Sequence, residues 1–329
     1  MLKAIEKSDA AVMSVMADIA ETKPDILLLT DFDYDRSGLA LRAMAAGLKA
    51  RGVEYAHLAV LPGNAGIPSG RDLDGDGRST GWEDSLGFGR FPGEGAMAVL
   101  SVFPIETAAM FDLNDLLWKD FPNASLPMKD GAIFPSQPAS DVQVLSTRGH
   151  VAVPIILPDG GRVWLLAAHA TPPVFDGPEN RNGLRNGDEI RLWTALLDGD
   201  LPGWRNGRDF VILGDLNADP FDGDGAHEAI RTLLNDPRTQ DPKPESEGGT
   251  LASRRQGGVN RRHGGDPALD TADWSDNEEG PGNLRVDYVL PSSGLEIADA
   301  GVHWPASAAE GRSGAKGSRH HLVWVDIVR

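Results

Sequence analysis

Short apolar segments that end in polar residues recur along this sequence. They cover residues 25–30, 97–101, 151–157, 163–170, 210–216, 284–290 and 321–327, with a further one near 55–60. Apolar residues recur at helical spacing over 8–22 and 37–50, and helices are also predicted at about 187–198 and 225–235. Strands and helices that are interleaved without strict alternation suit two packed sheets better than one doubly wound sheet. We therefore predict a four-layer α/β sandwich, in which two mixed β-sheets pack together between flanking helices, as a single domain over residues 1–329.

Two stretches lack this regular pattern. Residues 62–95 are rich in Gly, Pro and Asp, and residues 238–282 are rich in Gly, Asp, Asn and Arg. Both are predicted to be irregular. Long loops in compact domains are usually functional, so 62–95 is a candidate functional segment.

The sequence is acidic and has no cysteine, with 31 Lys plus Arg against 49 Asp plus Glu and a net charge of −18. This charge repels polyanions, so tight sequence-independent binding to duplex DNA is disfavoured. Without cysteine, any metal ion has to bind Asp, Glu, Asn or His. We expect no membrane span, because no run of about 20 apolar residues is found. Oligomeric state and compartment stay open, and a secreted or periplasmic location remains compatible if a signal peptide is missing from this chain.

The strongest local motif is Gly214-Asp215-Leu216-Asn217, directly after the apolar segment FVIL. It places an acid and an amide two residues apart, on one face of a strand end, where they can hold a divalent ion and a phosphate oxygen together. The alternative is an ordinary strand-to-turn transition, in which Gly, Asp and Asn are common for backbone reasons. Taken alone, the motif does not decide between the two.

Other apolar segments carry comparable polar residues. Asp31 follows the segment 25–30, His169 closes 163–170, Asp287 lies within 284–290, and His320 precedes 321–327. A single Asp or His in such a place is more often a hydrogen-bonded structural residue. Acid, amide and imidazole groups on five segments together instead indicate metal-assisted phosphoryl transfer, which needs carboxylates for a hard cation and a base to orient water.

These motifs resemble the endonuclease/exonuclease/phosphatase superfamily, which has the deoxyribonuclease I-like fold. The resemblance runs from about residue 24 to the C-terminus and rests on PDILLLTDFD, GDLN, VDYV and Ser318-Arg319-His320. It implies that Asp31 binds Mg²⁺ or Mn²⁺, and that His169, Asp215, Asn217, Asp287 and His320 are catalytic. It also implies that Asp287 orients an imidazole, which is either that of His169 or that of His320.

The sequence departs from the family pattern in three places. Asp31 stands where the family usually has Glu, and Arg319 replaces the acid of a Ser-Asp-His motif. The family also opens with a core strand that ends in Asn, whereas here MLKAIEKSDA leads directly into the first helix. We therefore expect the first strand to be missing. Arg319 adds a cation at the phosphate site and favours a doubly charged monoester.

Residues 72–83 fit the pattern of a calcium loop, D-x-D-x-D-G-x5-E, with Asp72, Asp74, Asp76 and Glu83 as ligands. A single structural Ca²⁺ site is predicted, and the alternative is an acidic surface turn. Arg181, Asn182, Arg185 and Asn186 are predicted to lie in a loop before a helix N-terminus, where phosphate binding is favourable. The alternative there is ordinary helix capping by Asn186 or Asp188.

The sequence thus predicts a metal-dependent phosphodiesterase or phosphomonoesterase, with nuclease activity included, that acts by in-line attack of water. Asp31 would hold the ion, Asp215 would orient or deprotonate water, Asn217 would position it, and His320 would stabilise the charged oxygens. Arg319 and the acidic surface favour small phosphoesters over long duplex DNA. The rival hypothesis is a catalytically weak, Ca²⁺-stabilised binding or structural protein that retains the fold.

Overall fold

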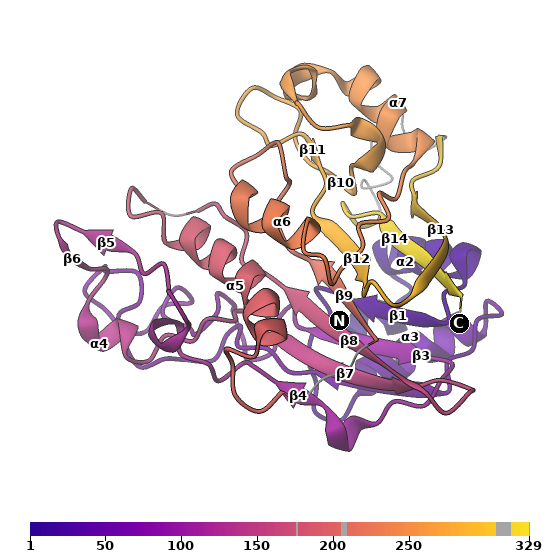
Figure 1. Ribbon diagram of the computed structural model, residues 1–329, viewed down its shortest axis with the longest axis horizontal. Coiled ribbons are helices and arrows are strands. Elements are labelled where there is room, and N and C mark those ends of the chain that lie inside the picture. The colour runs from indigo at the N-terminus through magenta and orange to yellow at the C-terminus, as the bar shows by residue number, and fades with distance from the viewer. Residues whose placement is uncertain (176, 205–208, 307–316, 329) are drawn as a thin grey trace.

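The computed structural model describes residues 1–175, 177–204, 209–306 and 317–328, and Figure 1 shows its elements. The α-helices are α1 (Leu2–Glu6), α2 (Ala10–Thr22), α3 (Leu39–Lys49), α4 (Gln137–Ser140), α5 (Arg181–Asp198), α6 (His227–Leu234) and α7 (Glu247–Gln256). The longer strands are β1 (Ile26–Leu29), β2 (His57–Leu61), β3 (Met97–Ser101), β7 (His150–Ile156), β8 (Arg162–His169), β9 (Phe210–Asp215), β12 (Asp287–Pro291), β13 (Glu296–His303) and β14 (Leu322–Val328). The two-residue strands are β4 (Phe111–Asp112), β5 (Met128–Lys129), β6 (Ala132–Ile133), β10 (Ala272–Asp273) and β11 (Asn283–Leu284). Within this part of the chain, no helix is long and apolar enough to cross a membrane.

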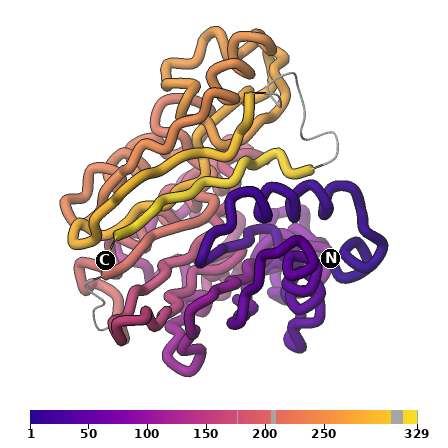
Figure 2. The backbone as a smooth tube through the Cα atoms, turned by 90° about the vertical axis from the view of Figure 1, so that its right-hand side faces the viewer, coloured from indigo at the N-terminus to yellow at the C-terminus, as the bar shows by residue number. Residues whose placement is uncertain are grey.

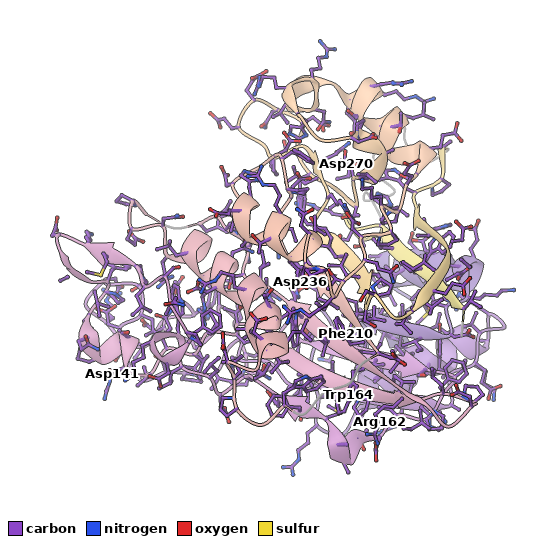
Figure 3. The ribbon with its side chains drawn as sticks, viewed as in Figure 1. Asp141, Arg162, Trp164, Phe210, Asp236 and Asp270 are labelled. Atoms are coloured by element: carbon purple, nitrogen blue, oxygen red, sulfur yellow. The ribbon has the colours of Figure 1, made fainter. Side chains whose placement is uncertain are left out.

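Two sheets form the centre of the molecule. One has the order β1-β3-β2 and is antiparallel throughout. The other has the order β12-β9-β8-β7-β4 and is mixed, because β8 and β9 run parallel whereas its other pairs are antiparallel. The parallel pair begins at Trp164 opposite Phe210, both labelled in Figure 3, and ends at His169 opposite Asp215.

Three apolar cores hold the layers together. The central core lies between the sheets and joins Leu61 and Val99 of one sheet to Val153 and Leu165 of the other. A second core packs helices α1 to α3 on the outer face of the three-stranded sheet, and a third packs α5 and α6 on the outer face of the five-stranded sheet. β3 is buried along its whole length because it is the central strand of its sheet. The resulting order of helix, sheet, sheet and helix confirms the predicted four-layer α/β sandwich.

Several elements differ from the sequence prediction. α5 begins at Arg181 instead of about 187, so the loop predicted there is helical. α7 and β13 were not predicted at all. The three-stranded sheet is antiparallel and not mixed. Residues 62–95 between β2 and β3 contain short bridges but no helix or named strand, as predicted.

The sheet edge formed by β1 bears on the prediction of a missing first strand. Among the described residues, β1 pairs only with β3, and β14 pairs only with β13 in a separate two-stranded sheet. Figure 2 shows this C-terminal hairpin running beside the N-terminal helices. Nε2 of His303 at the end of β13 lies 3.7 Å from Oδ1 of Asp18 in α2, which holds the hairpin against that helix. No strand joins β1 to β14 in the part of the chain that the structure describes.

A buried carboxylate on α5 fixes two loops next to the strand ends. Glu189 is fully buried, and its Oε1 accepts hydrogen bonds from the amide and hydroxyl of Thr147 at 2.8 and 3.1 Å. Its Oε2 accepts a 2.6 Å hydrogen bond from the amide of Thr171. Burial raises the pKa of Glu189. The loop before β7 and the loop after β8 are therefore tied to one helix.

Close contact between β8 and β9 requires glycine at position 214. Gly214 has φ +138°, and a Cβ there would lie 1.8 Å from the carbonyl oxygen of Ala168. No side chain fits at that distance, so any larger residue forces the two strands apart.

We expect Gly214→Ala to lower the free energy of unfolding by roughly 3 kcal/mol or more, since it combines a backbone clash with an unfavourable φ. Gly199 is the matched control, because it has φ +83° and no atom within 4 Å of an added Cβ. Gly199→Ala should cost about 1 kcal/mol from backbone strain alone. Denaturant unfolding measures both, and equal losses would show that the contact at Gly214 is not tight.

Candidate active site

The polar residues predicted from the sequence meet at one end of neighbouring strands. His169 at the end of β8 is the parallel partner of Asp215 at the end of β9. Asp287, the first residue of β12, is the antiparallel partner of Asp215. His320 precedes β14 and forms a bridge with Ala272. The register of one sheet therefore sets the positions of three of these groups.

Short contacts join the groups in two pairs. Nδ1 of His320 lies 2.9 Å from Oδ2 of Asp287, an oxygen that also accepts a 2.8 Å hydrogen bond from the Thr271 hydroxyl. Nε2 of His169 lies 3.5 Å from Oδ2 of Asp215. Ligand atoms of Asp215, Asp287 and His320 all lie within 4.8 Å of one another. The imidazole beside Asp287 is thus that of His320, whereas His169 faces Asp215.

Asn217 fixes the carboxylate of Asp215. Its backbone amide donates to Oδ1 of Asp215 at 2.8 Å, and its side-chain amide donates to Oδ2 at 3.1 Å. The same side chain donates to the carbonyl of Ala170 at 2.9 Å. Asn217 has φ +49°, a left-handed conformation that asparagine tolerates well. These contacts and the left-handed backbone explain why asparagine is found two residues after the end of β9.

The two imidazoles differ in charge near neutral pH, because one ring is neutral and the other is cationic. Burial lowers the pKa of His169 to about 4, so it is neutral. Burial also opposes charge on His320, but the carboxylates of Asp287 and Asp215 outweigh it and raise the pKa of His320 to about 10. Burial raises the pKa of Asp215, and the charge of His320 partly offsets this. Asp215 therefore lies between a neutral and a cationic ring.

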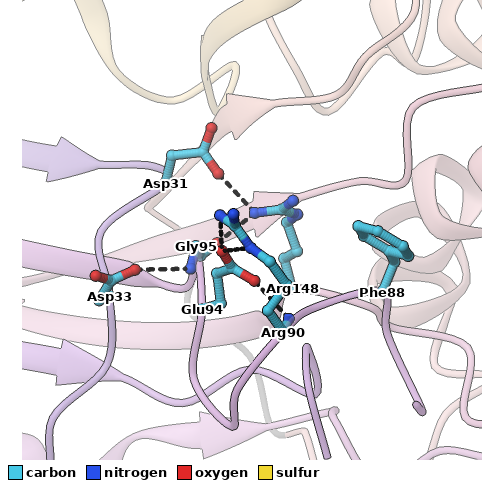
Figure 4. Close-up of a pocket in the computed structure, with 7 residues that line it drawn as sticks. All are labelled: Asp31, Asp33, Phe88, Arg90, Glu94, Gly95 and Arg148. Atoms are coloured by element: carbon cyan, nitrogen blue, oxygen red, sulfur yellow. Dashed lines mark hydrogen bonds and ion pairs between the residues drawn. The ribbon is translucent and has the colours of Figure 1, made fainter. Parts of the chain in front are cut away.

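Asp31 lies beyond the end of β1, in a pocket of about 320 Å³ that Figure 4 shows. Its Oδ1 lies 2.6 Å from Nη1 of Arg148, and its side chain is 68% exposed. It lies outside the group of three residues with ligand atoms within 4.8 Å. Its charge nevertheless contributes to the pKa shifts of His169 and Asp215, so it belongs to the same electrostatic site.

The donor atoms present suit a hard divalent ion. Asp31 offers an exposed carboxylate, and Asp215 and Asp287 offer two more beside His320. Carboxylate oxygens are the ligands that Mg²⁺ and Mn²⁺ prefer in proteins. The buried Asp215 also ionises with difficulty, and a nearby cation would favour its charged form.

The residues predicted to bind phosphate before the helix lie within α5, and two of them are inside the protein. Arg185 is buried and donates to the carbonyls of Leu145, Leu86 and Val144. Asn186 is fully buried and donates to the carbonyls of Thr171 and Leu216 at 2.9 Å. Because their donors bind backbone, both residues hold α5 in place and do not face a substrate.

Arg181 and Asn182, in the first turn of α5, also bind backbone carbonyls. Arg181 donates to Leu73, and Asn182 donates to Val174 at 2.6 Å. Arg319 is different, because its side chain is exposed next to His320. Its carbonyl accepts a 3.0 Å hydrogen bond from the amide of Asp273. Of the three predicted phosphate-binding arginines, Arg319 is therefore the most exposed to solvent.

The acidic loop folds differently from the predicted calcium pattern. The three residues whose ligand atoms lie within 4.8 Å of one another are Asp72, Asp74 and Asp84. Asp76 and Glu83 are exposed and lie outside this group. Asp84 is buried and accepts from the amides of Leu73 and Gly81 at 2.9 and 2.7 Å. Asp84 thus takes the place in the cluster that the pattern assigns to Glu83, one residue earlier in the sequence.

Sequence reasoning missed Thr271 and Arg148. Thr271 lies in the segment 238–282, where no periodicity marked its role, and its hydroxyl also accepts from the amides of Val286 and Asp287 at 3.0 Å. Arg148 lies in STRGH, directly before an apolar segment. The signal that could have identified Arg148 is its place directly before a predicted strand, at the sheet end where other strands carry polar residues.

Comparisons with known proteins agree with this architecture. No curated protein matches the chain. An endonuclease/exonuclease/phosphatase structure from Beutenbergia cavernae is 16% identical with a TM-score of 0.56, and the match covers 96% of this chain but only 65% of that one. A family protein from Leptotrichia buccalis is 16% identical with a TM-score of 0.53, and the match covers 97% and 92% of the two chains. At this identity the likeness shows a shared fold.

The sequence profile of the Endonuclease/Exonuclease/phosphatase family matches residues 7–320, which confirms the resemblance that the motifs indicated. Because this match spans nearly all of the 329 residues, the chain belongs to the Endonuclease/Exonuclease/phosphatase family, a family of phosphate-ester hydrolases.

Proposed function

We propose that this protein hydrolyses phosphate esters of small molecules by in-line attack of water, with Mg²⁺ or Mn²⁺ as its cofactor. The observation that carries the proposal is the position of Asp215, between neutral His169 and cationic His320. A base beside a fixed cation is what attack of water on a phosphoryl group requires.

His320 is the proposed stabiliser of negative charge on the phosphoryl oxygens. Oδ2 of Asp287, which Thr271 holds in turn, binds Nδ1 of His320, so Nε2 is the ring nitrogen that can donate to a ligand. The raised pKa keeps the ring charged at neutral pH, so it needs no proton before the reaction. A donor that is oriented and charged in advance acts more strongly on the transition state than on the ground state.

Asp215 is the proposed base that orients or deprotonates the attacking water. Its raised pKa makes it a stronger base than an ordinary carboxylate. Asn217 donates hydrogen bonds to both carboxylate oxygens of Asp215. We therefore propose that Asn217 orients Asp215 and does not contact the attacking water itself. His169 contacts Asp215 through Nε2 and helps to keep it in this orientation.

Asp31 would hold the divalent ion, which supplies positive charge to the phosphoryl oxygens when it is bound. Its carboxylate is mostly exposed, so an ion can reach it from solvent. Asp31 is one methylene shorter than glutamate, so the ion would bind closer to the backbone or through water.

Small phosphoesters are the proposed substrates. The net charge of −18 disfavours long duplex DNA, whereas a small anion can be attracted by local cations. Arg319 is exposed beside His320 and adds such a charge. A monoester carries nearly two negative charges and gains more from an extra cation than a diester does.

Replacing Asp215 tests the chemistry directly. We expect Asp215→Asn to lower kcat about 100-fold or more with little change in KM, because the amide keeps the shape but is not a base. Steady-state kinetics with a phosphomonoester and added Mg²⁺ measures this, with Glu228→Gln, at an exposed position of α6, as the control. An unchanged kcat would contradict the role of Asp215. Absence of turnover in the wild type would favour the rival hypothesis of a binding or structural protein.

Charge reversal at position 319 tests the substrate class. We expect Arg319→Asp to shift the ratio of kcat/KM values from monoesters toward diesters, because it removes one positive charge and adds a negative one at the exposed edge of the site. The ratio is measured on wild type and variant with the same leaving group. If the ratio does not change, Arg319 takes no part in choosing the substrate.

A structural calcium site in the loop of residues 72–84 is a separate proposal. Asp72, Asp74 and Asp84 bring their oxygens within 4.8 Å, and oxygen ligands suit Ca²⁺. Burial and neighbouring acids raise the pKa of Asp74, and a bound cation would relieve that repulsion. The loop also carries the carbonyl of Leu73 that binds Arg181, so it is linked to α5.

Two variants of this loop test the calcium proposal, because Asp74 belongs to the acidic cluster whereas Glu83 lies outside it. We expect Ca²⁺ to raise the melting temperature of the wild type and of Glu83→Gln, but not of Asp74→Asn, because Asp74 belongs to the cluster and Glu83 does not. Thermal unfolding with Ca²⁺ and with EDTA measures the difference. Equal changes in melting temperature for the two variants would show that the loop is an acidic turn and not a Ca²⁺ site.

A further inference from the structure

Arg148 and Asp31 form an ion pair inside the pocket of Figure 4. Nη1 of Arg148 lies 2.6 Å from Oδ1 of Asp31 and donates a 3.1 Å hydrogen bond to the carbonyl of Gly95. The Arg148 side chain is 23% exposed, compared with 68% for Asp31. The guanidinium therefore forms an ion pair with the carboxylate that is proposed to hold the divalent ion.

Two features of the backbone hold this cation in place. Gly95 has φ +60°, and a Cβ there would lie 1.8 Å from Nη1 of Arg148 and 2.7 Å from Oδ1 of Asp31. Only glycine leaves room for the pair. On the other side, Thr147 precedes Arg148 and is bound to the buried Glu189 through amide and hydroxyl. The arginine thus extends from a fixed backbone into a space that a side chain at position 95 would fill.

The other acids of the pocket have partners of their own. Glu94 binds Arg90, with Nη2 and Oε1 2.5 Å apart, and Asp33 accepts a 3.3 Å hydrogen bond from the amide of Gly95. If an ion takes the Asp31 carboxylate, Arg148 loses its carboxylate partner. A guanidinium released from its ion-pair partner at the wall of an open pocket can donate hydrogen bonds to an anion. Arg90 and, to a smaller extent, Arg148 lower the pKa of Glu94, so this carboxylate competes with the anion.

Arg148 also acts on the proposed reactive groups at a distance. Its charge lowers the pKa of His169, whereas the charge of Asp31 raises it. The pocket and the pair formed by His169 and Asp215 are therefore one electrostatic unit.

We propose that Arg148 competes with the divalent ion for Asp31 and, once displaced, binds an anionic phosphate group in this pocket. Ion and phosphate then bind cooperatively, because the ion releases the cation that the phosphate needs. Thermodynamic linkage requires the effect to be reciprocal, so phosphate strengthens ion binding by the same factor. This inference rests on the ion site of the proposed function.

Ion affinity without phosphate tests the competition. Mn²⁺ binding is measured by electron paramagnetic resonance on wild type, Arg148→Gln, Arg90→Gln and Asp31→Asn. We expect Arg148→Gln to bind Mn²⁺ about three- to tenfold more tightly than wild type, since a partly exposed ion pair is removed. Arg90→Gln removes a charge from the same pocket without touching Asp31, so it should change the affinity less than about twofold.

Phosphate affinity tests the coupling. Binding of inorganic phosphate is measured by calorimetry with and without saturating Mn²⁺. Wild type should bind phosphate more tightly with Mn²⁺, and this gain should shrink at least about threefold in Arg148→Gln but not in Arg90→Gln. A direct contact between ion and phosphate alone would give the same gain in all three proteins.

The variants separate two kinds of failure. If Asp31→Asn binds Mn²⁺ as well as wild type, the ion site of the proposed function is wrong and the inference falls with it. If Asp31→Asn loses Mn²⁺ but Arg148→Gln binds Mn²⁺ like wild type, the ion site stands and only the competition is overturned. If Arg90→Gln and Arg148→Gln tighten Mn²⁺ binding equally, the effect is general electrostatics, and the proposal is also overturned.

Discussion

The parallel pairing of β8 and β9 decides where the proposed reactive groups lie. His169 and Asp215 end these strands as direct partners, and Asp287 pairs with Asp215 from the other side. A slip of one residue would turn the side chains to the opposite face of the sheet, so the register has to be firmly fixed. Gly214 allows the close contact, and the apolar cores on both faces of the sheet hold it.

The environment then gives similar side chains different properties. His169 is enclosed and neutral, whereas His320 lies beside two carboxylates and is charged. Among the described residues, none forms a hydrogen bond with the buried Nδ1 of His169, so its position depends on packing and on the contact of Nε2 with Asp215. Different charge states of two equivalent groups allow a single site to hold both a base and a cation.

Local patterns predicted the strands and the residues at their ends, because apolar runs that stop at polar residues mark the edge of a buried sheet. They did not predict the start of α5, since Arg181 and Asn182 follow glycine- and proline-rich sequence. Arg185 and Asn186 were assigned to a substrate because their burial depends on tertiary contacts, with Leu145 before β7 and with Thr171 after β8. Arg148 and Thr271 were missed for the same reason, as their partners lie 117 and 16 residues away along the chain.

The central claim is that Asp215 lies between one neutral imidazole, that of His169, and one cationic imidazole, that of His320. Nitrogen-15 NMR titration of the histidine rings in metal-free protein tests it most directly. The account predicts that His320 stays protonated until about pH 10 and that His169 stays neutral down to about pH 4. In Asp287→Asn, the pKa of His320 should fall, because its largest favourable partner is lost. Titration of both rings near their ordinary value of 6.5 would contradict the account.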